Sequence, residues 1–190
     1  MHKLLILFFV AIAIILLIAP NNENRLRGES SLYQKAYSKA VEEAIGRSIL
    51  WASDEQIRRL VNSVERKYGG EIKQISKKYY TSSKDIKAIT IVESLTEEEA
   101  ESGDGAVGLM GVKRTTGMDM GFNDIEHPIN NLKAGTKYYK MLLNKFKDRD
   151  LALAAYNLGP REVENRLSNG FNPETMDYIW KIRRVRQFVM

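Results

Sequence analysis

The chain has 190 residues, 44% of them hydrophobic, which is enough for one domain with a sizeable core and additional segments. It has no cysteine, so disulfides, thiol nucleophiles and cysteine-based zinc sites are excluded. Its only two histidines are His2 and His127, and a histidine-rich metal site or a serine triad would depend on His127 alone. The net charge of +5 suits an anionic polymer or surface as a partner.

Residues 4–19 form an uninterrupted apolar run behind Lys3. This run is shorter than the about 20 residues of a membrane span and longer than the roughly 7–15 residues of a signal-peptide core. No A-x-A cleavage site precedes Asn21, and Pro20 is unfavourable for cleavage directly after the run. We therefore favour an uncleaved anchor over a cleaved signal peptide, and both place the rest of the chain outside the cytoplasm. A buried helix of a soluble protein is the weaker alternative.

Two polar amphipathic helices are predicted between residues 30 and 67. Their apolar stripes are Tyr33, Ala36, Ala40 and Ala44 in the first, and Ile57, Leu60, Val61 and Val64 in the second. Gly69 and Gly70 predict a break after them. We therefore expect an anchor or signal peptide at residues 1–20, a helical linker or stalk at 21–67 and a compact domain at 68–190.

The compact domain is predicted to be all-α, because it has no alternating Val/Ile/Thr segment of strand length. Ser82 and Asp85 resemble the start of a capped helix. After Asn130 and Asn131, which are suitable N-cap types, apolar residues follow helical spacing. These residues are Leu132, Gly135, Tyr139, Leu142 and Phe146.

The alanine-rich run from Leu151 to Tyr156 is too uniformly apolar for a surface helix, so it should be central. Asn157 and Gly159 should end it, and Pro160 should begin the next helix. The densest basic run lies near the C-terminus and is interpreted as a solvated helix face rather than a binding patch, so no nucleic acid partner is expected. Its members are Lys181, Arg183, Arg184 and Arg186.

Glu93 is the most informative residue, because it shares a helix face with Ile86, Ile89 and Thr90. Burial and the negative end of the helix dipole both raise the pKa of such a carboxyl group. A carboxyl group that stays protonated near neutral pH can act as a general acid. The alternative is a partly exposed glutamate at a frayed helix end.

The stretch from Gly103 to Gly108 formally matches the dinucleotide-binding pattern G-x-G-x-x-G. No strand precedes it, and the acids around it would repel a pyrophosphate. Those acids are Glu97, Glu98, Glu99, Glu101 and Asp104. We interpret the glycines as a tight loop that lets the backbone approach an extended ligand.

Four sequence blocks between about residues 70 and 185 occur in the order of one known family. They are Glu93-Ser94 with Ala100, Ser102 and Gly105–Met110; Asn131-Leu132 with Ala134-Gly135; Ala154–Asn157 with Gly159-Pro160 and Val163; and Pro173–Thr175 with Tyr178. Together they resemble the soluble lytic transglycosylase domain of glycoside hydrolase family 23.

The resemblance implies a lysozyme-like helical domain, of the goose-type and lytic transglycosylase kind, at residues 68–190. It implies a peptidoglycan lytic transglycosylase that cleaves the MurNAc-β-1,4-GlcNAc bond and leaves 1,6-anhydro-MurNAc ends. The implied partners are peptidoglycan glycan strands, with the membrane reached through residues 4–19, and the implied location is the cell envelope outside the cytoplasm. No metal and no cofactor are needed for this chemistry.

The resemblance also assigns roles to single residues. Glu93 matches the sole catalytic acid and base. The matched substrate-binding positions are Ser102, Met110, Tyr156 and Asn157, and the matched supporting positions are Ser94, Glu174 and Tyr178. Core packing is the alternative role for Met110 and Tyr156.

Two positions depart from the family pattern. Gly111 stands where the family has glutamine, so either a sugar contact is missing or the backbone needs a positive φ at this position. Glu97 and Glu98 replace an Asn-Pro pair, and their charges should raise the pKa of Glu93 further.

Two other functions remain open. A goose-type-lysozyme-like muramidase would direct water instead of a sugar hydroxyl, with Glu97, Glu99 or Asp104 orienting the water. A catalytically silent wall-binding module is the second alternative, which the glycine at Gly111 motivates and the intact Glu93 and Tyr156 disfavour.

Overall fold

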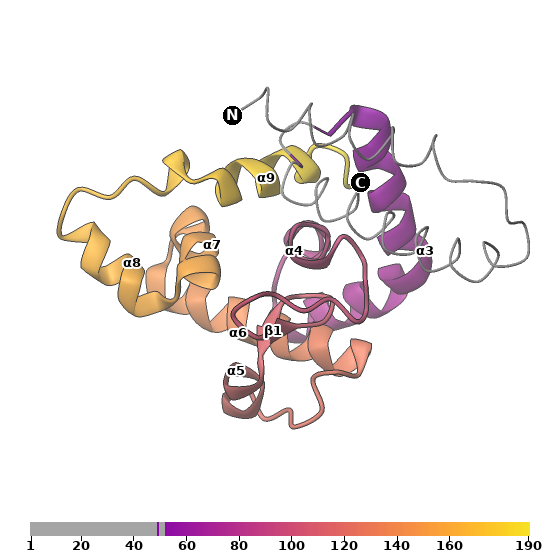
Figure 1. The fold of residues 1–190 in the computed structure, drawn as a ribbon, viewed down its shortest axis with the longest axis horizontal. Coiled ribbons are helices and arrows are strands. Elements are labelled where there is room, and N and C mark those ends of the chain that lie inside the picture. Colours follow the sequence, from indigo (N-terminus) through magenta and orange to yellow (C-terminus); the bar gives the residue numbers. More distant parts are fainter. Residues whose placement is uncertain (1–48, 50–51) are drawn as a thin grey trace, which may run out of the picture. The chain divides into compact units, whose positions relative to one another are not determined.

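The computed structural model describes residue 49 and residues 52–190. The predicted anchor at 4–19 and the first predicted amphipathic stripe lie outside these residues. The elements are α3 (Asp54–Tyr79), α4 (Ser83–Ser94), β1 (Ala106–Val107), β2 (Val112–Lys113), α5 (Arg114–Asp119), α6 (Pro128–Phe146), α7 (Arg149–Leu158), α8 (Pro160–Leu167), the 3-10 helix η1 (Pro173–Thr175) and α9 (Asp177–Arg186) (Figure 1). In this described part, no helix has both the length and the apolar character of a membrane span.

The prediction of a helical domain is confirmed, with one small addition. β1 and β2 pair antiparallel, with Ala106 opposite Lys113 and Val107 opposite Val112. Strands of two residues are too short to show an alternating pattern, so they could not be predicted from the sequence. The hairpin carries the segment between Gly108 and Gly111 at its tip.

α3 corrects the predicted break at Gly69 and Gly70, because the helix runs through both glycines. A glycine inside a helix costs only about 1 kcal/mol, which burial of the helix's apolar stripe outweighs. Gly69 has a packing role: a Cβ there would lie 2.6 Å from the carboxylate of Glu65, which forms an ion pair with Lys87 of α4. Residue 68, where we expected the compact domain to begin, therefore lies in the middle of a helix.

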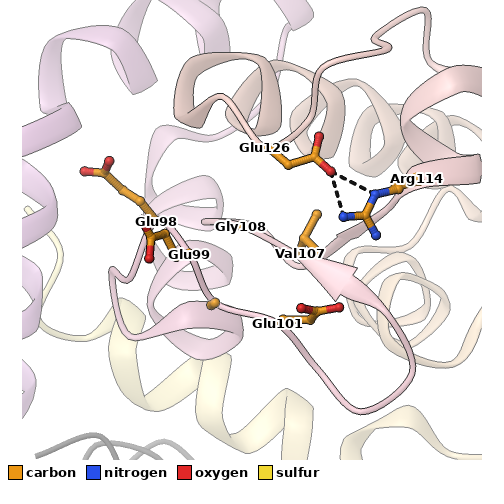
Figure 2. A pocket seen from close by; sticks show the side chains of 8 residues that line it. Glu98, Glu99, Glu101, Val107, Gly108, Arg114 and Glu126 are labelled. Atoms are coloured by element: carbon orange, nitrogen blue, oxygen red, sulfur yellow. Dashed lines mark hydrogen bonds and ion pairs between the residues drawn. The ribbon is translucent and has the colours of Figure 1, made fainter. Parts of the chain in front are cut away.

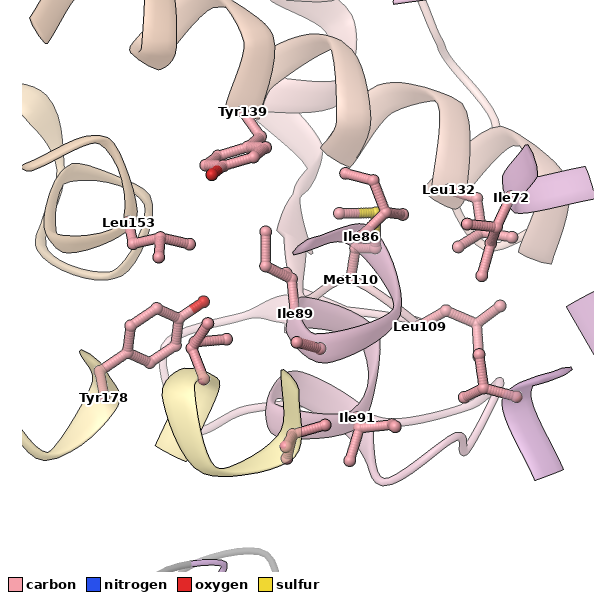
Figure 3. Close-up of a cluster of buried hydrophobic side chains, with 14 of the residues drawn as sticks. Ile72, Ile86, Ile89, Ile91, Leu109, Met110, Leu132, Tyr139, Leu153 and Tyr178 are labelled. Atoms are coloured by element: carbon pink, nitrogen blue, oxygen red, sulfur yellow. The ribbon is translucent and has the colours of Figure 1, made fainter. Parts of the chain in front are cut away.

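α4 is buried along almost its whole length. It begins at the predicted cap, since the Ser82 side chain accepts a hydrogen bond from the Asp85 amide, and it packs between α3 and α9. Its residues from Asp85 to Ile91 are all buried. Figure 3 shows Tyr139 of α6 and Tyr178 of α9 pointing toward this helix from two directions. The last turn of α4, which carries Glu93, is thereby held from several sides.

α6 begins earlier than predicted. Its first residue is Pro128, and a ring nitrogen of His127 accepts a hydrogen bond from the Ile129 amide as the N-cap. The proposal that Asn130 or Asn131 caps this helix is therefore wrong. The predicted apolar stripe is confirmed, with Phe146 partly buried and the other members buried: Leu132, Gly135, Tyr139 and Leu142.

α7 is central, as predicted, with Ala152 to Ala155 fully buried. Gly159 ends it with a φ of 87°, and Pro160 is the first residue of α8. Both boundaries confirm the sequence prediction, because glycine adopts a positive φ without strain and proline suits the first turn of a helix.

The basic run on α9 is not simply solvated. Its arginines form ion pairs with acids from other elements: Arg183 with Asp150 and Glu174, Arg184 with Asp54, and Arg186 with Asp85. Local sequence could not reveal these pairs, since every partner except Glu174 lies more than 30 residues away. α9 is therefore joined to α3, α4 and α7 by charge as well as by apolar contact.

The continuity of α3 gives a first prediction. Ile57 is fully buried, so Ile57→Ala should lower the free energy of unfolding of the whole domain by about 2–5 kcal/mol. Arg59→Ala, an exposed control on the same helix, should change it by less than about 0.5 kcal/mol. Urea denaturation measures both. An unchanged unfolding midpoint in Ile57→Ala would show that residues 54–67 form a stalk independent of the domain.

Candidate active site

Glu93 lies half-buried in the last turn of α4. The hydroxyl group of Tyr178 donates a hydrogen bond of 2.7 Å to its Oε1 atom. Tyr178 lies in the first turn of α9 and is itself buried. The predicted catalytic carboxyl group is therefore contacted directly by a residue for which the sequence suggested only a supporting position.

Burial is the main reason why the pKa of Glu93 rises to about 7. The hydrogen bond from Tyr178 and the charge of Lys181 lower this pKa, and the charge of Asp104 raises it. Glu97 and Glu98, which we expected to contribute, are exposed and are not among the groups that shift it. Near neutral pH, Glu93 can therefore hold a proton and can also release it.

Gly111 lies directly against Glu93. Its φ is 56°, and a Cβ at this position would lie 2.7 Å from the Oε2 atom of Glu93. A side chain here would meet both backbone strain and a steric clash with the carboxyl group. The geometry therefore favours the backbone account of Gly111 over the account in which a sugar contact is merely missing.

Met110 is clamped by hydrogen bonds from two helices. Its amide donates to Oδ1 of Asn131 at 2.8 Å, and its carbonyl accepts from the hydroxyl of Tyr156 at 2.8 Å. Met110 is fully buried, which favours its packing alternative over a contact between its side chain and sugar. Through this clamp, α6 and α7 fix the backbone that continues into Gly111.

Asn131 is a positioning residue whose importance the sequence did not reveal. Its fully buried side-chain amide group donates to the carbonyls of Val107 and Ile125, and its side-chain oxygen accepts from the Met110 amide. A buried amide that makes three hydrogen bonds fixes the loop around it. The only signal in the sequence was the resemblance of Asn131 and Leu132 to a family block, which we interpreted as a helix start.

Gly135 explains how α6 comes so close to this clamp. A Cβ at Gly135 would lie 2.7 Å from the Cβ of Met110 and 2.8 Å from the hydroxyl oxygen of Tyr156. The side chain of any other residue would push these groups apart. Gly135 therefore allows Tyr156 to reach the Met110 carbonyl.

Tyr156 and Tyr178 stay protonated near Glu93. Burial is the largest cause that raises the pKa of each phenol, and the nearby charge of Glu93 raises both further. Each hydroxyl is therefore a neutral donor at any pH at which the domain works. The structure thus brings together Glu93, Gly111, Tyr156 and Tyr178.

The other predicted residues lie around this group. Ser94 is buried and closes the end of α4, where its hydroxyl donates to the Thr90 carbonyl and accepts from the Thr96 amide. Asn157 is exposed at the end of α7. Glu174 is exposed on η1 and forms an ion pair with Arg183. These positions suit supporting roles for Ser94 and Glu174 and leave Asn157 accessible.

Ser102 and Asp104 lie in the exposed loop before β1. The Ser102 hydroxyl donates to Oδ1 of Asp104 at 2.5 Å, and Lys113 of β2 forms an ion pair of 2.7 Å with the same carboxylate. Lys113, followed by Ser102, holds the pKa of Asp104 below its usual range. Asp104 is therefore an anion with two partners of its own, although its charge still affects Glu93.

A pocket of about 190 Å³ lies beside Val107 of β1 (Figure 2). It is lined by Glu98, Glu99, Ala100, Glu101, Val107, Gly108, Arg114 and Glu126. Arg114 and Glu126 form an ion pair of 2.8 Å in its wall, and none of the predicted catalytic, substrate-binding or supporting residues lines it. Within residues 52–190, no group of three His, Asp or Glu side chains is arranged to hold a metal ion.

Comparison with known proteins gives a family and a fold. The family model of the transglycosylase SLT domain matches residues 70–179, more than half of the chain. A membrane-bound lytic murein transglycosylase F of Cellvibrio japonicus is 37% identical over 87 residues, which are 42% of this chain and 18% of the relative. Its counterpart in Pseudoalteromonas translucida is 33% identical over 81 residues, which are 39% and 17% of the two chains. The match therefore spans less than a fifth of either relative.

Two solved structures resemble the fold. An inactive mutant of the lytic transglycosylase Slt of Pseudomonas aeruginosa has a TM-score of 0.53 at 22% identity, covering 82% of this chain and 26% of the other. The 70 kDa soluble lytic transglycosylase of Escherichia coli has a TM-score of 0.58 at 20% identity, covering 77% and 29%. This likeness confirms the predicted lysozyme-like, all-α fold.

The raised pKa of Glu93 predicts how stability depends on pH. The folded state holds this proton more tightly than the unfolded state. The contribution of protonated Glu93 to the free energy of unfolding is therefore full below the ordinary pKa of 4.5 and is lost as the pH rises through about 7. When the pH is raised from about 5 to about 9, the unmodified protein should therefore lose about 1–3 kcal/mol more free energy of unfolding than Glu93→Gln does. Urea denaturation at both pH values measures this. An equal pH dependence in the two proteins would mean that Glu93 titrates at its ordinary pKa.

The close approach at Gly111 gives a third prediction. Gly111→Gln should lower the free energy of unfolding by about 1–3 kcal/mol, because it adds both a clash and a strained φ. Gly105→Gln is a matched control, since Gly105 also has a positive φ but open space where a Cβ would be. A larger loss at Gly111 than at Gly105 isolates the clash with Glu93. If Gly111→Gln is instead stable and more active, a missing side-chain contact is the better account.

Proposed function

Because the chain belongs to the transglycosylase SLT domain family, we propose that it is a peptidoglycan lytic transglycosylase. It cleaves the MurNAc-β-1,4-GlcNAc bond and leaves 1,6-anhydro-MurNAc ends. The observation that carries this proposal is Glu93, a half-buried carboxyl group with a pKa of about 7 and a tyrosine donor at 2.7 Å. One such group can serve as both acid and base in a single reaction.

In the first step, protonated Glu93 gives its proton to the glycosidic oxygen between MurNAc and GlcNAc. The bond from MurNAc C1 to this oxygen breaks, and GlcNAc leaves with a hydroxyl group. The 2-acetamido group of MurNAc stabilises the oxocarbenium-like charge, so no carboxylate nucleophile is needed. Tyr178 stabilises the glutamate anion that remains, because its hydroxyl donates directly to the Oε1 atom.

In the second step, the Glu93 anion takes the proton of the MurNAc C6 hydroxyl. The C6 oxygen bonds to C1 and closes the 1,6-anhydro ring, and Glu93 is protonated again for the next cycle. Water takes no part in either step, so the two products together contain the same atoms as the uncleaved strand. The pKa of about 7 supports both steps, since a carboxyl group with an ordinary pKa would seldom be protonated at neutral pH.

Hydrolysis by a goose-type-lysozyme-like route needs a second carboxylate that orients water. Asp104 already has partners in Ser102 and Lys113, which favour its anion but also occupy its oxygens. Glu97 and Glu99 are exposed and do not shift the pKa of Glu93. These features support ring closure over hydrolysis.

A catalytically silent wall-binding module is the other alternative. This alternative was suggested by Gly111, which departs from the family pattern. In the structure, however, the glycine makes room for the Glu93 carboxyl group, which stays in the site. The exposed side chains of Ser102 and Asn157 are our proposed sugar contacts, with Tyr156 as the positioning residue behind the loop. An enzyme is therefore the better proposal.

The location of the enzyme is also a proposal. We place it in the cell envelope outside the cytoplasm, attached to the membrane through residues 4–19, because this apolar run lacks a good cleavage site. The name of both curated relatives describes them as membrane-bound, which agrees with this proposal.

The function predicts a specific loss of activity. Glu93→Gln should fold normally but lose at least about a hundredfold in lytic rate, because the amide cannot donate the proton. Glu97→Gln, an exposed control four residues away, should keep its activity. A zymogram and a turbidity assay on purified peptidoglycan measure both, and mass spectrometry should find products one water lighter than hydrolysed ends. Hydrolysed ends alone would favour the muramidase, and activity in Glu93→Gln would place the acid elsewhere.

The anchor gives a separate prediction. The full-length protein should fractionate with membranes, and protease added outside intact spheroplasts should digest the domain. Deletion of residues 2–19 should release it from the membrane fraction. Recovery of a mature form that begins near residues 20–25 would instead show a cleaved signal peptide.

A further inference from the structure

α9 runs antiparallel to α4 and is joined to it by polar contacts at both ends. Tyr178 in the first turn of α9 donates to Glu93 in the last turn of α4. Arg186, the last residue of α9, forms an ion pair of 2.7 Å with Asp85 in the first turn of α4. Each helix is thus fixed to the other at its two ends.

The two contacts have matching separations. Asp85 and Glu93 are eight residues apart on α4, and Tyr178 and Arg186 are eight residues apart on α9. At 1.5 Å per residue, both spans are about 12 Å. A shift of α9 along α4 would therefore break both contacts together, while the apolar side chains between them could repack against a shifted neighbour.

Asp85 is a rigid support for this ion pair. Only 4% of its surface is exposed, and its carboxylate also contacts Arg149 of α7 at 3.1 Å and the hydroxyl of Tyr139 of α6 at 3.2 Å. A buried carboxylate with partners on three other helices fixes their arrangement, because each broken contact leaves charge without a partner. Arg186 is therefore bound to a group that cannot follow it if α9 moves.

We propose that Arg186 and Asp85 are a positioning pair for the reaction: their ion pair sets the register of α9 along α4 and thereby holds the Tyr178 hydroxyl on Glu93. This inference rests on the proposed function, because the ion pair would affect catalysis only through Tyr178 and Glu93. Of the other charged groups that act on Glu93, Asp104 lies in the loop before β1, whereas Lys181 lies on α9 and would move together with Tyr178.

The other arginines of α9 serve as comparisons. Arg183 pairs with Asp150 of α7 and Glu174 of η1, and Arg184 pairs with Asp54 of α3. Neither contacts α4 by these pairs. Arg184→Met therefore removes one ion pair from α9 without removing its link to α4, and it is a matched control for Arg186→Met.

The test measures Glu93 directly. Carbon-13 NMR of labelled glutamate side chains, assigned through Glu93→Gln, gives the titration midpoint of Glu93 without substrate. Tyr178→Phe removes a donor that favours the anion, so the midpoint should rise, by about one pH unit for a tenfold change in proton affinity. Arg186→Met should raise it in the same direction, and in the double variant the two rises should not add fully, because both changes remove the same donor from Glu93. Arg184→Met should leave it unchanged, and Arg186→Lys should restore part of the shift.

Several results would overturn the proposal: a folded Arg186→Met protein with the unmodified midpoint, a shift that adds fully to that of Tyr178→Phe, or an equal shift in Arg184→Met. If Arg186→Met does not fold, the neutralised pair Asp85→Asn with Arg186→Gln replaces it, because it removes both charges of the ion pair while Arg149 keeps Asp150 as a partner, and the same midpoints are expected. Since these titrations need no substrate, they are distinct from a failure of the proposed function. Failure of the proposed function would appear as full lytic activity in Glu93→Gln, even if the titration midpoints of Glu93 shift as expected in the α9 variants.

Discussion

The hydrogen bond from Tyr178 to Glu93 is the contact on which the account of this domain depends. Burial at the end of α4 favours the neutral carboxyl group, and the phenol favours its anion, so that the pKa lies at about 7. Without burial, Glu93 would be ionised at neutral pH and could not donate a proton. Without the donor, the anion formed in the first step would be less stable. The balance of these two effects allows one residue to act first as an acid and then as a base.

Most of the surrounding structure serves to keep backbone and side chains close to this carboxyl group. Gly111 allows the hairpin to lie against Glu93, and Gly135 allows α6 to approach Met110 and Tyr156. The amide of Asn131 then fixes the hairpin through three hydrogen bonds. Because these contacts leave little free volume, the carboxyl group is held in a partly dehydrated setting, which is the main cause of its raised pKa.

Local patterns predicted the helices well, because period and caps act within a few residues: the buried run from Leu151 to Tyr156 is an example. Apart from the cap of α6, the failures involve contacts between distant segments. α3 continues through Gly69 because its apolar stripe packs against α4 and α6, Asn131 is buried because the hairpin folds onto it, and Arg186 meets an acid about a hundred residues earlier in the chain. The resemblance to a family pointed to Glu93 as the candidate acid, but it could not show which side chain donates to it.

The most direct test of this account is to compare two pH curves on the same protein. One is the single-turnover rate of glycan cleavage, and the other is the titration of Glu93 followed by carbon-13 NMR. The rate should fall as the pH rises, with an apparent pKa equal to the midpoint of Glu93, near 7. A Glu93 midpoint near its ordinary value of 4.5, or a rate that is independent of its ionisation, would contradict it.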